Sequence, residues 1–418
     1  MTGNPSGAGW LNRTVWGMAV TSFLSDLGHE AQSTLLPGFM AALGLPPAAL
    51  GLVEGVADAA SSFMKLLAGW FSDRLGRRKE LVVFGYVATG LSSGIIALAS
   101  GWPLILAGKF FGWVGRGGKA PLRDALLTDS IPPEARGRAF GFHRAGDTLG
   151  AILGPVAAVA LMAWGAGRGL AGSALAGSAH AGSAHAALWS RTLIAWTLVP
   201  GVLSGLAFAL LVPERARHPR QRPSFRHALR QMTVPFRRLL GAVGCFGAGD
   251  FNHTLLILAA TQLLAPRLGP AVAATWGGML YVLHNVVYAL SAYPVGALAD
   301  RARSHRRILG LGYALGAVVP LLLIPCFNRG GAGLPALAGI FALAGLVNGI
   351  KDTLEGATAA DLVPADHRGL GFGLLGGVNG FGDLLSSAVV GLLWTLHPAL
   401  GFGYAAALMG MGAAAMLA

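Results

Sequence analysis

The sequence predicts an all-α integral membrane protein with twelve transmembrane helices arranged as two similar six-helix bundles. Three observations lead to this fold class. Apolar residues make up 54% of the 418 residues and charged residues only 12%, whereas soluble globular proteins carry about 25% charged residues. The apolar residues fall into blocks of about 20, the length that crosses a bilayer as a helix. The second half of the chain also repeats motifs of the first.

The expected spans follow one another along the whole chain. They cover residues 14–42, 48–71, 81–100, 103–128, 138–164, 190–212, 237–264, 273–298, 308–327, 332–360, 370–395 and 399–418. The first of them is too long to be the core of a cleavable signal peptide, so we expect it to remain as a span. The 63 glycines fit this arrangement, because helices packed in lipid approach each other through small residues.

The connections between spans indicate the domain limits and the orientation. We expect an N-terminal bundle over 1–212, a basic cytoplasmic linker over 213–236 and a C-terminal bundle over 237–418. Lys and Arg gather in the connections of one side, which the positive-inside rule assigns to the cytoplasm, with both termini. A bacterial inner membrane is the expected location. The positive charge of the linker is then explained by membrane topology, and we expect no nucleic-acid binding. The Ala/Gly/Ser/His insert 171–186 is expected to be an outer loop without an assigned role.

An internal repeat relates the two halves. KAPLRDALLTDSIPPEARGRAFG, which begins at Lys119, aligns without gaps with KDTLEGATAADLVPADHRGLGFG, which begins at Lys351. GWFSDRLGRRK at 69–79 likewise lies over GALADRARSHR at 296–306. Parallel repeats of this kind place a substrate site near the bilayer midplane, where the two halves meet.

The loop at 69–79 resembles the signature loop between helices 2 and 3 of the major facilitator superfamily. The segment GDTLGAILGP at 146–155 also resembles the helix 5 motif of that family's proton-coupled drug and metabolite antiporters. The resemblance implies the twelve-helix fold, alternating access and a latch that holds one conformation, with Arg77 reaching Asp129. The latch residues that it implies are Gly69, Asp73, Arg74, Gly76, Arg77, Asp129, Gly150, Gly154 and Pro155.

Several ionisable residues fall near the middle of predicted spans. A charge at that depth costs about 2.5–3.5 kcal/mol on insertion scales, and such residues usually face a water-filled cavity. Two lysines at equivalent repeat positions would flank the passage and suit an anionic solute. The alternative is that nearby aspartates neutralise them and the solute is neutral or zwitterionic. The expected substrate-binding residues are Lys119, Lys351, Arg116, Asp26, His29, Asp250, His253 and Asn285.

Acidic residues one helical turn apart predict a site for the coupling ion. Glu54 and Asp58 share a helix face, and two carboxylates in contact repel when both are ionised, which favours holding a proton between them. Glu30 and Asp147 extend the expected proton path. Paired acids on helix 2 also resemble the cation site of the family's sodium-coupled sugar carriers, so sodium is the alternative ion.

A transported metal is a further alternative. Asp26 and His29, with Asp250 and His253 at the equivalent positions, supply carboxylate and imidazole ligands that suit divalent iron, manganese or zinc. The solute could then be a divalent metal or an anionic metal chelate of the iron or siderophore type. A hydrogen bond within each Asp–His pair is the simpler explanation, so no bound metal or cofactor is expected.

No motif for catalysis is found. The glycine-rich GRGGK at 115–119 lies within a span and lacks the strand–turn–helix context of a phosphate-binding loop. We therefore expect no enzyme. The sequence predicts a monomeric, proton-coupled secondary transporter that moves a small organic solute, anionic or amphipathic, out of the cell.

Overall fold

The computed structural model describes residues 9–45, 53, 56–57, 60–68, 78–167, 181–213, 232–268 and 270–418. The regular structure of these residues is helical throughout, which confirms the predicted all-α class. Several predicted functional residues lie outside the described ranges. They are Glu54, Asp58, Gly69, Asp73, Arg74, Gly76 and Arg77.

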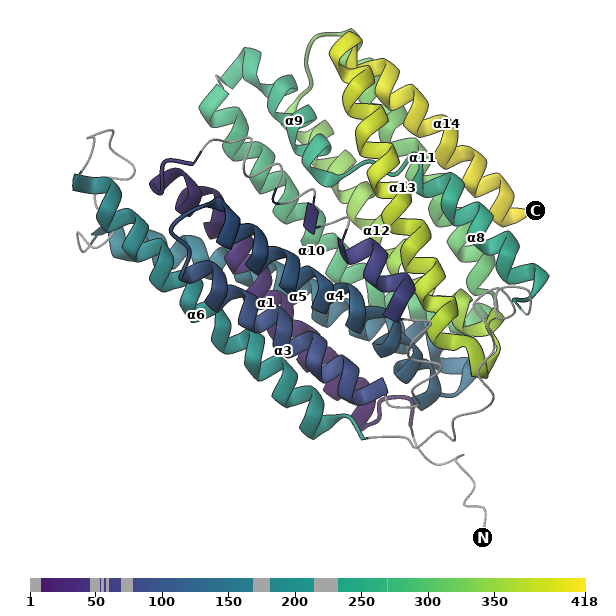
Figure 1. Ribbon diagram of the computed structural model, residues 1–418. Helices are drawn as coiled ribbons and strands as arrows, with labels where there is room; N and C mark the ends of the chain where they lie inside the picture. The colour runs from purple at the N-terminus through teal and green to yellow at the C-terminus, as the bar shows by residue number, and fades with distance from the viewer. Residues whose placement is uncertain are drawn as a thin grey trace. The chain divides into compact units, whose positions relative to one another are not determined.

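Most described helices follow the predicted spans to within a few residues (Figure 1). The expectation of a loop over 171–186 is wrong at its end, because helix α6 begins at Ala181. Most of the span expected over 48–71 lies outside the described residues. The first half contains α1 Arg13–Ala42, α3 Arg78–Ala97, α4 Trp102–Ser130, the short 3₁₀ turn η2 Pro133–Ala135, α5 Arg136–Gly167 and α6 Ala181–Leu211. The second half contains α8 Val234–Gly247, α9 His253–Leu268, α10 Pro270–Ala302, α11 His305–Asn328, α12 Leu334–Leu362, η3 Ala365–His367, α13 Arg368–Leu396 and α14 Pro398–Leu417.

One predicted span is not a single helix. The span expected over 237–264 is divided into α8 and α9, and the residues between Gly247 and His253 leave helical geometry. The backbone of this break is held in part by side chains of α13, since Ser386 Oγ donates to the Asp250 carbonyl oxygen over 2.8 Å. The break places Asp250 at a helix interruption and not within a regular turn.

Contacts divide the chain into two compact units. Unit 1 comprises residues 1–130 and 146–222, and unit 2 comprises 131–145 and 223–418. The first ten residues of α5 therefore group with the second half of the chain, while the rest of α5 groups with the first. The domain limits proposed from the sequence, 1–212 and 237–418, stay a prediction.

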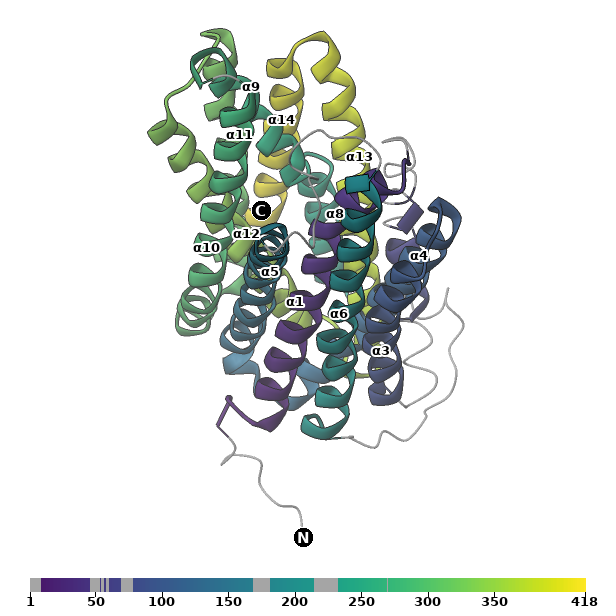
Figure 2. The same ribbon diagram turned by 90° about the vertical axis from the view of Figure 1, so that its left-hand side faces the viewer.

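In unit 1, α3 packs between α4 and α6, and α6 also packs along α1; Figure 2 shows α1, α6 and α3 as neighbouring rods. Glycines make the α3–α6 contact close. A Cβ atom added to Gly90 would lie 2.5 Å from the carbonyl carbon of Gly201. In unit 2, α10 packs against α9 and α12, and α11 against α12 and α14.

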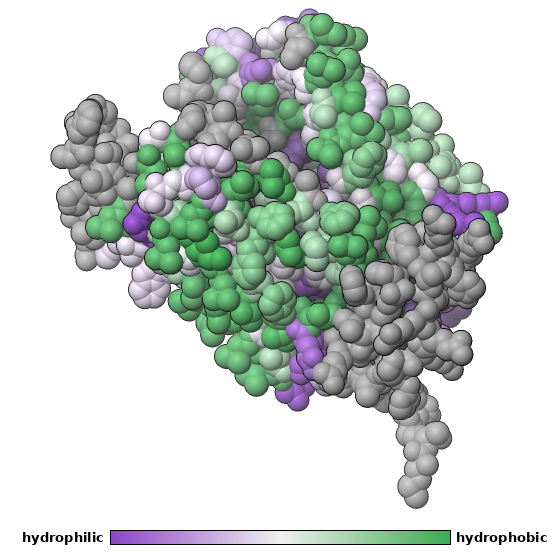
Figure 3. All heavy atoms as spheres, in the orientation of Figure 1, coloured by the Kyte–Doolittle hydropathy of each residue, from purple (hydrophilic) through white to green (hydrophobic). Residues whose placement is uncertain are grey.

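The outward surfaces of the helices are apolar. Leu98, Leu290 and Leu396 are each more than 70% exposed, and Figure 3 shows hydrophobic side chains over most of the visible described surface. Among the described residues, eight helices are long and apolar enough to cross a membrane. Helices α1 and α4 correspond to further predicted spans, but they carry several charged side chains within their length.

Candidate functional site

In unit 1, a cluster of charged side chains gathers between α1, α4 and α5. Arg116 of α4 forms an ion pair with Asp26 of α1, with 2.8 Å between Nη1 and Oδ1. The carboxyl group of Asp147, from α5, lies next to that of Asp26 within hydrogen-bonding reach. Asp26 is only 5% exposed. Two acids and an arginine thus share one buried position.

Lys119 lies one helical turn from Arg116 and has a different environment. Its Nζ donates to Ser25 Oγ over 2.8 Å and lies 3.7 Å from the ring centre of Tyr86. The side chain is 3% exposed. Within the described part of the chain, no carboxylate comes within ion-pair distance of this ammonium group. Asp26 and Asp147 are near enough to attract this charge without pairing with it. Among the described residues, Lys119 is therefore a buried cation with polar and aromatic neighbours but no direct ion pair.

The neighbouring residues of α1 and α4 complete the cluster. His29 places its ring edge-on against Trp113, with 5.3 Å between ring centres, and the Arg116 guanidinium lies over the same indole. Glu30 is near enough to Arg116 to interact with its charge. His29 therefore packs against an aromatic ring at the edge of the cluster. The predicted acids Glu54 and Asp58 fall outside the described residues.

In unit 2, the repeat partner of Lys119 is fully neutralised. Lys351 Nζ lies 2.6 Å from Asp250 Oδ2 and 3.9 Å from Asp352 Oδ1. Tyr288 of α10 donates its hydroxyl to the second oxygen of Asp352. Lys351 and Lys119 occupy equivalent positions of the repeat, but among the described residues only Lys351 has a direct ion pair.

Unit 2 also contains a buried acid that the sequence analysis missed. Glu355 is 3% exposed and accepts hydrogen bonds from the Tyr313 hydroxyl and from Asn379 Nδ2, the latter over 2.6 Å. The repeat alignment contained a signal for it, because Glu355 stands opposite Arg123. The repeat therefore aligns a carboxylate of the second half with a guanidinium of the first, so the two halves carry opposite charges at this repeat position.

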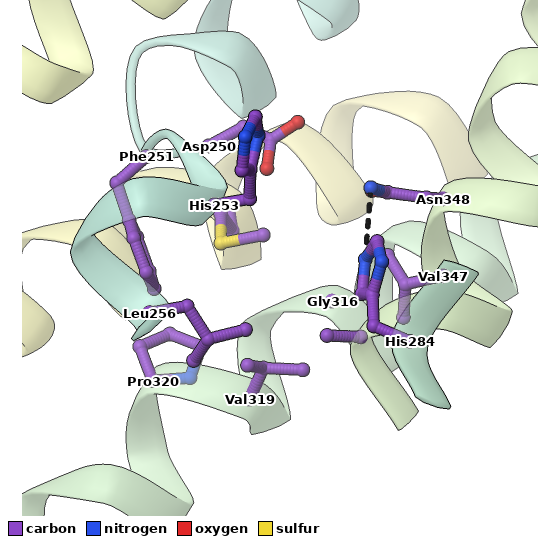
Figure 4. A pocket seen from close by; sticks show the side chains of 12 residues that line it. Asp250, Phe251, His253, Leu256, His284, Gly316, Val319, Pro320, Val347 and Asn348 are labelled. Atoms are coloured by element: carbon purple, nitrogen blue, oxygen red, sulfur yellow. Dashed lines mark hydrogen bonds between the residues drawn. The ribbon is translucent and has the colours of Figure 1, made fainter. Parts of the chain in front are cut away.

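A pocket opens beside the break between α8 and α9 (Figure 4). Asp250 and His253 line it from the break and the start of α9, His284 from α10 and Asn348 from α12. His284 contacts Asn285 Oδ1 through Nδ1 and Asn348 Nδ2 through Nε2. The predicted residues Asp250 and His253 thus face one pocket, while Asn285 serves to orient His284.

The predicted latch is described only in part. Asp129 accepts a hydrogen bond from Arg78 Nη1 over 2.9 Å, while Arg77, its predicted partner, lies outside the described residues. Gly150 and Gly154 lie where α5 crosses α1, because a Cβ atom on either would meet the α1 backbone at Phe23 or Leu27. Pro155 follows inside α5. These two glycines therefore permit helix packing.

The second copy of the signature loop is described completely, within unit 2. Asp300 accepts hydrogen bonds from the backbone N–H groups of Gly137 and Arg138 at the start of α5, over 2.8 and 2.9 Å. A carboxylate is favoured at a helix N-terminus by these unpaired donors. His305 lies between Asp300 and Asp361, with its two ring nitrogens 2.9 and 2.7 Å from their oxygens.

The described residues contain no metal-binding cluster of the kind that transport of a metal would require. No group of three or more His, Cys, Asp or Glu side chains there is arranged to hold a metal ion. His29 packs on Trp113 and His253 stacks on Tyr281. A transported metal stays a prediction from the sequence without support from these contacts.

Comparisons with known proteins place this geometry in context. A family model described as Major Facilitator Superfamily matches residues 18–264 and 242–418. An uncharacterized MFS-type transporter, MJ1317 of Methanocaldococcus jannaschii, is 25% identical over 95% of this chain and 92% of its own length. The 4-hydroxybenzoate transporter PcaK of Pseudomonas aeruginosa is 25% identical over 90% of this chain and 86% of its own.

A solved structure agrees at the level of the fold. The E. coli fucose:proton symporter FucP, in its outward conformation, superimposes with a TM-score of 0.74. The match covers 95% of this chain and 98% of FucP at 16% sequence identity. Identity this low supports the fold alone and says nothing of the solute.

Proposed function

The chain belongs to the major facilitator superfamily, and from this premise we propose that it is a proton-coupled transporter of small organic anions. It is a multi-pass integral membrane protein and a transporter of small solutes, not an enzyme. The proposal concerns the class of solute, the coupling ion and the direction of transport.

The observation that carries the proposal is the environment of Lys119. Among the described residues Lys119 has no direct ion pair, and a buried cation without one is unfavourable, because it loses its hydration and is only partly compensated by the more distant Asp26 and Asp147. A solute carboxylate would supply that charge, and Arg116 lies one turn away on the same helix. Lys351 cannot play the same part without first losing its pair with Asp250. The name of the relative PcaK points the same way, since 4-hydroxybenzoate is an aromatic carboxylate.

The proposed proton carriers are Asp26 and Asp147. Their carboxyl groups lie side by side, and ionising both at once is opposed by their mutual repulsion. Arg116 forms an ion pair with Asp26. The proton on this acid pair and the solute anion both act through Arg116, and the exchange proposed below requires that they bind in alternate conformations. Glu30 lies near the same arginine and is placed to pass the proton on.

The proposed direction is outward, in exchange for protons, from a bacterial inner membrane with cytoplasmic termini. It rests on the resemblance of Gly150, Gly154 and Pro155 to the antiporter motif and on the distribution of Lys and Arg. The proposal treats the protein as a monomer that works by alternating access.

The test is a flux measurement in proteoliposomes. Vesicles are preloaded with radiolabelled 4-hydroxybenzoate, or with one of a panel of aromatic and aliphatic carboxylates, and the outside is made acidic. An antiporter releases its anion faster under this gradient in either insertion orientation, whereas a symporter would take up external anion instead. Lys119→Gln should reduce the flux at least about tenfold, since a charge-assisted contact is lost. Lys79→Gln, a lysine outside the cluster, is the matched control and should transport normally.

Equal flux in empty vesicles and in vesicles with protein, across the whole panel, would contradict the proposed solute class. Flux that ignores the pH gradient but follows a sodium gradient would instead support the sodium alternative.

A further inference from the structure

The pocket at the break between α8 and α9 has a chemistry of its own, separate from the charged cluster of unit 1. Because the chain leaves helical geometry between Gly247 and His253, side chains from four further helices reach the space beside it. The pocket is formed entirely by residues of unit 2.

The charges at its rim are already balanced. Asp250, the acid among its lining residues, forms an ion pair with Lys351 at 2.6 Å. His284 has both ring nitrogens occupied, one beside the Asn285 oxygen and one beside the Asn348 amide nitrogen. One nitrogen must donate and the other accept, which is the state of a neutral imidazole. An added charge would therefore be buried here without a partner, so the pocket favours an uncharged ligand.

Two hydrogen-bonding groups at the rim remain open to a ligand. His253 stacks on Tyr281, with 4.6 Å between ring centres and 12° between planes, and its ring nitrogens have no hydrogen-bond partner among the described residues. The Asn348 side-chain oxygen also has no hydrogen-bond partner among the described residues, since the amide nitrogen is the atom that contacts His284. A neutral imidazole offers one donor and one acceptor, and a hydroxyl group can pair with either.

The remaining wall is apolar and suits a ring. In Figure 4, Leu256, Val319 and Pro320 lie across the pocket from Asn348 and His284. Phe251 flanks the same side and packs edge-on against Phe402. A small planar body would bury apolar surface here while its polar end stays at the rim.

We propose that this pocket binds an uncharged ring compound that carries a hydroxyl group, a ligand of the phenol type. The hydroxyl pairs with His253 and Asn348, and the ring lies against Leu256, Val319 and Pro320. The pocket is thus a binding site in unit 2 that operates independently of the anion site proposed around Lys119.

The test measures binding of phenol and of toluene, which replaces the hydroxyl with a methyl group of similar size. The full-length protein in lipid nanodiscs is examined by equilibrium dialysis with radiolabelled ligands, and binding to empty nanodiscs is subtracted. Phenol should bind about fivefold more tightly than toluene, the effect of about one net hydrogen bond. Ala344→Leu, which fills the pocket, should abolish saturable binding of both. Ala336→Leu, on an exposed position of the same helix, is the matched control and should bind as the parent does.

His253→Phe tests the hydrogen bond at the rim separately from the volume of the cavity. Phenylalanine preserves the ring stack on Tyr281 but removes both nitrogens, so the preference for phenol should disappear while toluene binding is unchanged. The proposal is overturned if phenol and toluene bind equally to the parent protein, or if saturable binding survives Ala344→Leu in a folded protein. Saturable binding of benzoate that Ala344→Leu abolishes would also overturn it, because the pocket would then accept a charge. Lys119→Gln should leave phenol binding intact, so failure here is distinguishable from failure of the proposed anion transport.

Discussion

The ammonium group of Lys119 lies 3.7 Å from the ring centre of Tyr86 and has Ser25 Oγ as its hydrogen-bond partner at 2.8 Å. The face of an aromatic ring attracts a cation, by about 2 kcal/mol or more where water is excluded. This attraction holds the side chain in place without cancelling its charge. The repeat partner Lys351 is instead paired with Asp250. Both halves have a lysine at this repeat position, and among the described residues only Lys119 of unit 1 has no direct ion pair.

The first prediction compares the two lysines by stability. Lys351→Met should lower the free energy of unfolding by roughly 1–3 kcal/mol, because Asp250 loses its partner in a partly wet position. Lys119→Met removes a buried charge without a direct ion pair among the described residues, together with its contacts to Tyr86 and Ser25, so it should cost less stability than Lys351→Met. Thermal unfolding of the purified variants in one detergent provides the measurement. A larger loss for Lys119→Met than for Lys351→Met would show that Lys119 is a structural residue.

The second prediction concerns the ion pair between Asp26 and Arg116. Asp26→Asn and Arg116→Gln should each destabilise the protein by about 1–3 kcal/mol, since each removes one partner of a buried ion pair. The double variant should be less destabilised than the sum of the two, because the neutral side chains can hydrogen-bond. A double-mutant cycle by thermal unfolding measures this coupling. Strictly additive effects would mean that the contact at 2.8 Å contributes nothing.

The third prediction tests the position of His305. Its two ring nitrogens face Asp300 and Asp361, and only the protonated ring can donate to both. The repeat places Arg78 at the equivalent position, where it pairs with Asp129. His305→Arg should therefore keep the stability of the parent within about 1 kcal/mol, whereas His305→Gln should lose about 1–3 kcal/mol. If the glutamine variant proves as stable as the arginine variant, the charge of His305 is not needed.

The fourth prediction concerns helix packing in unit 1. Gly90→Ala places a methyl group 2.5 Å from the Gly201 carbonyl carbon, and overpacking of this kind costs about 1–3 kcal/mol. Gly278→Ala is the control, since its added methyl group meets nothing within 4 Å, and it should stabilise α10 by about 0.5–1 kcal/mol. Equal melting temperatures for the two variants would mean that α3 and α6 do not approach so closely.

The sequence predicted the helical class, the repeat and most residues of the charged cluster. Hydrophobic periodicity and the positions of charged residues are sufficient for these predictions, because a charged side chain within an apolar span usually faces the interior of the protein. Asp26, Arg116 and Lys119 do lie close together in unit 1, and Asp250 and Lys351 in unit 2. The break before α9 was missed, although two glycines flank it in the segment GAGD at 247–250, because glycine is also common at close helix contacts in lipid.

Charge balance was not predictable from residue spacing. The repeat shows that Lys119 and Lys351 are equivalent in sequence, but it does not show which of them meets a carboxylate. That outcome depends on side-chain direction and on the irregular backbone at Asp250. The same holds for Glu355, whose role is set by Tyr313 and Asn379 from other helices.

The most direct test of the account is the affinity of the purified protein for an organic anion, measured by equilibrium dialysis with 4-hydroxybenzoate in the parent, in Lys119→Gln and in Lys119→Arg. We expect the glutamine variant to bind at least about tenfold more weakly, since it lacks the positive charge. The arginine variant should stay within a few-fold of the parent. Equal affinity of the glutamine variant and the parent would contradict the claim that Lys119 provides the charge for the solute.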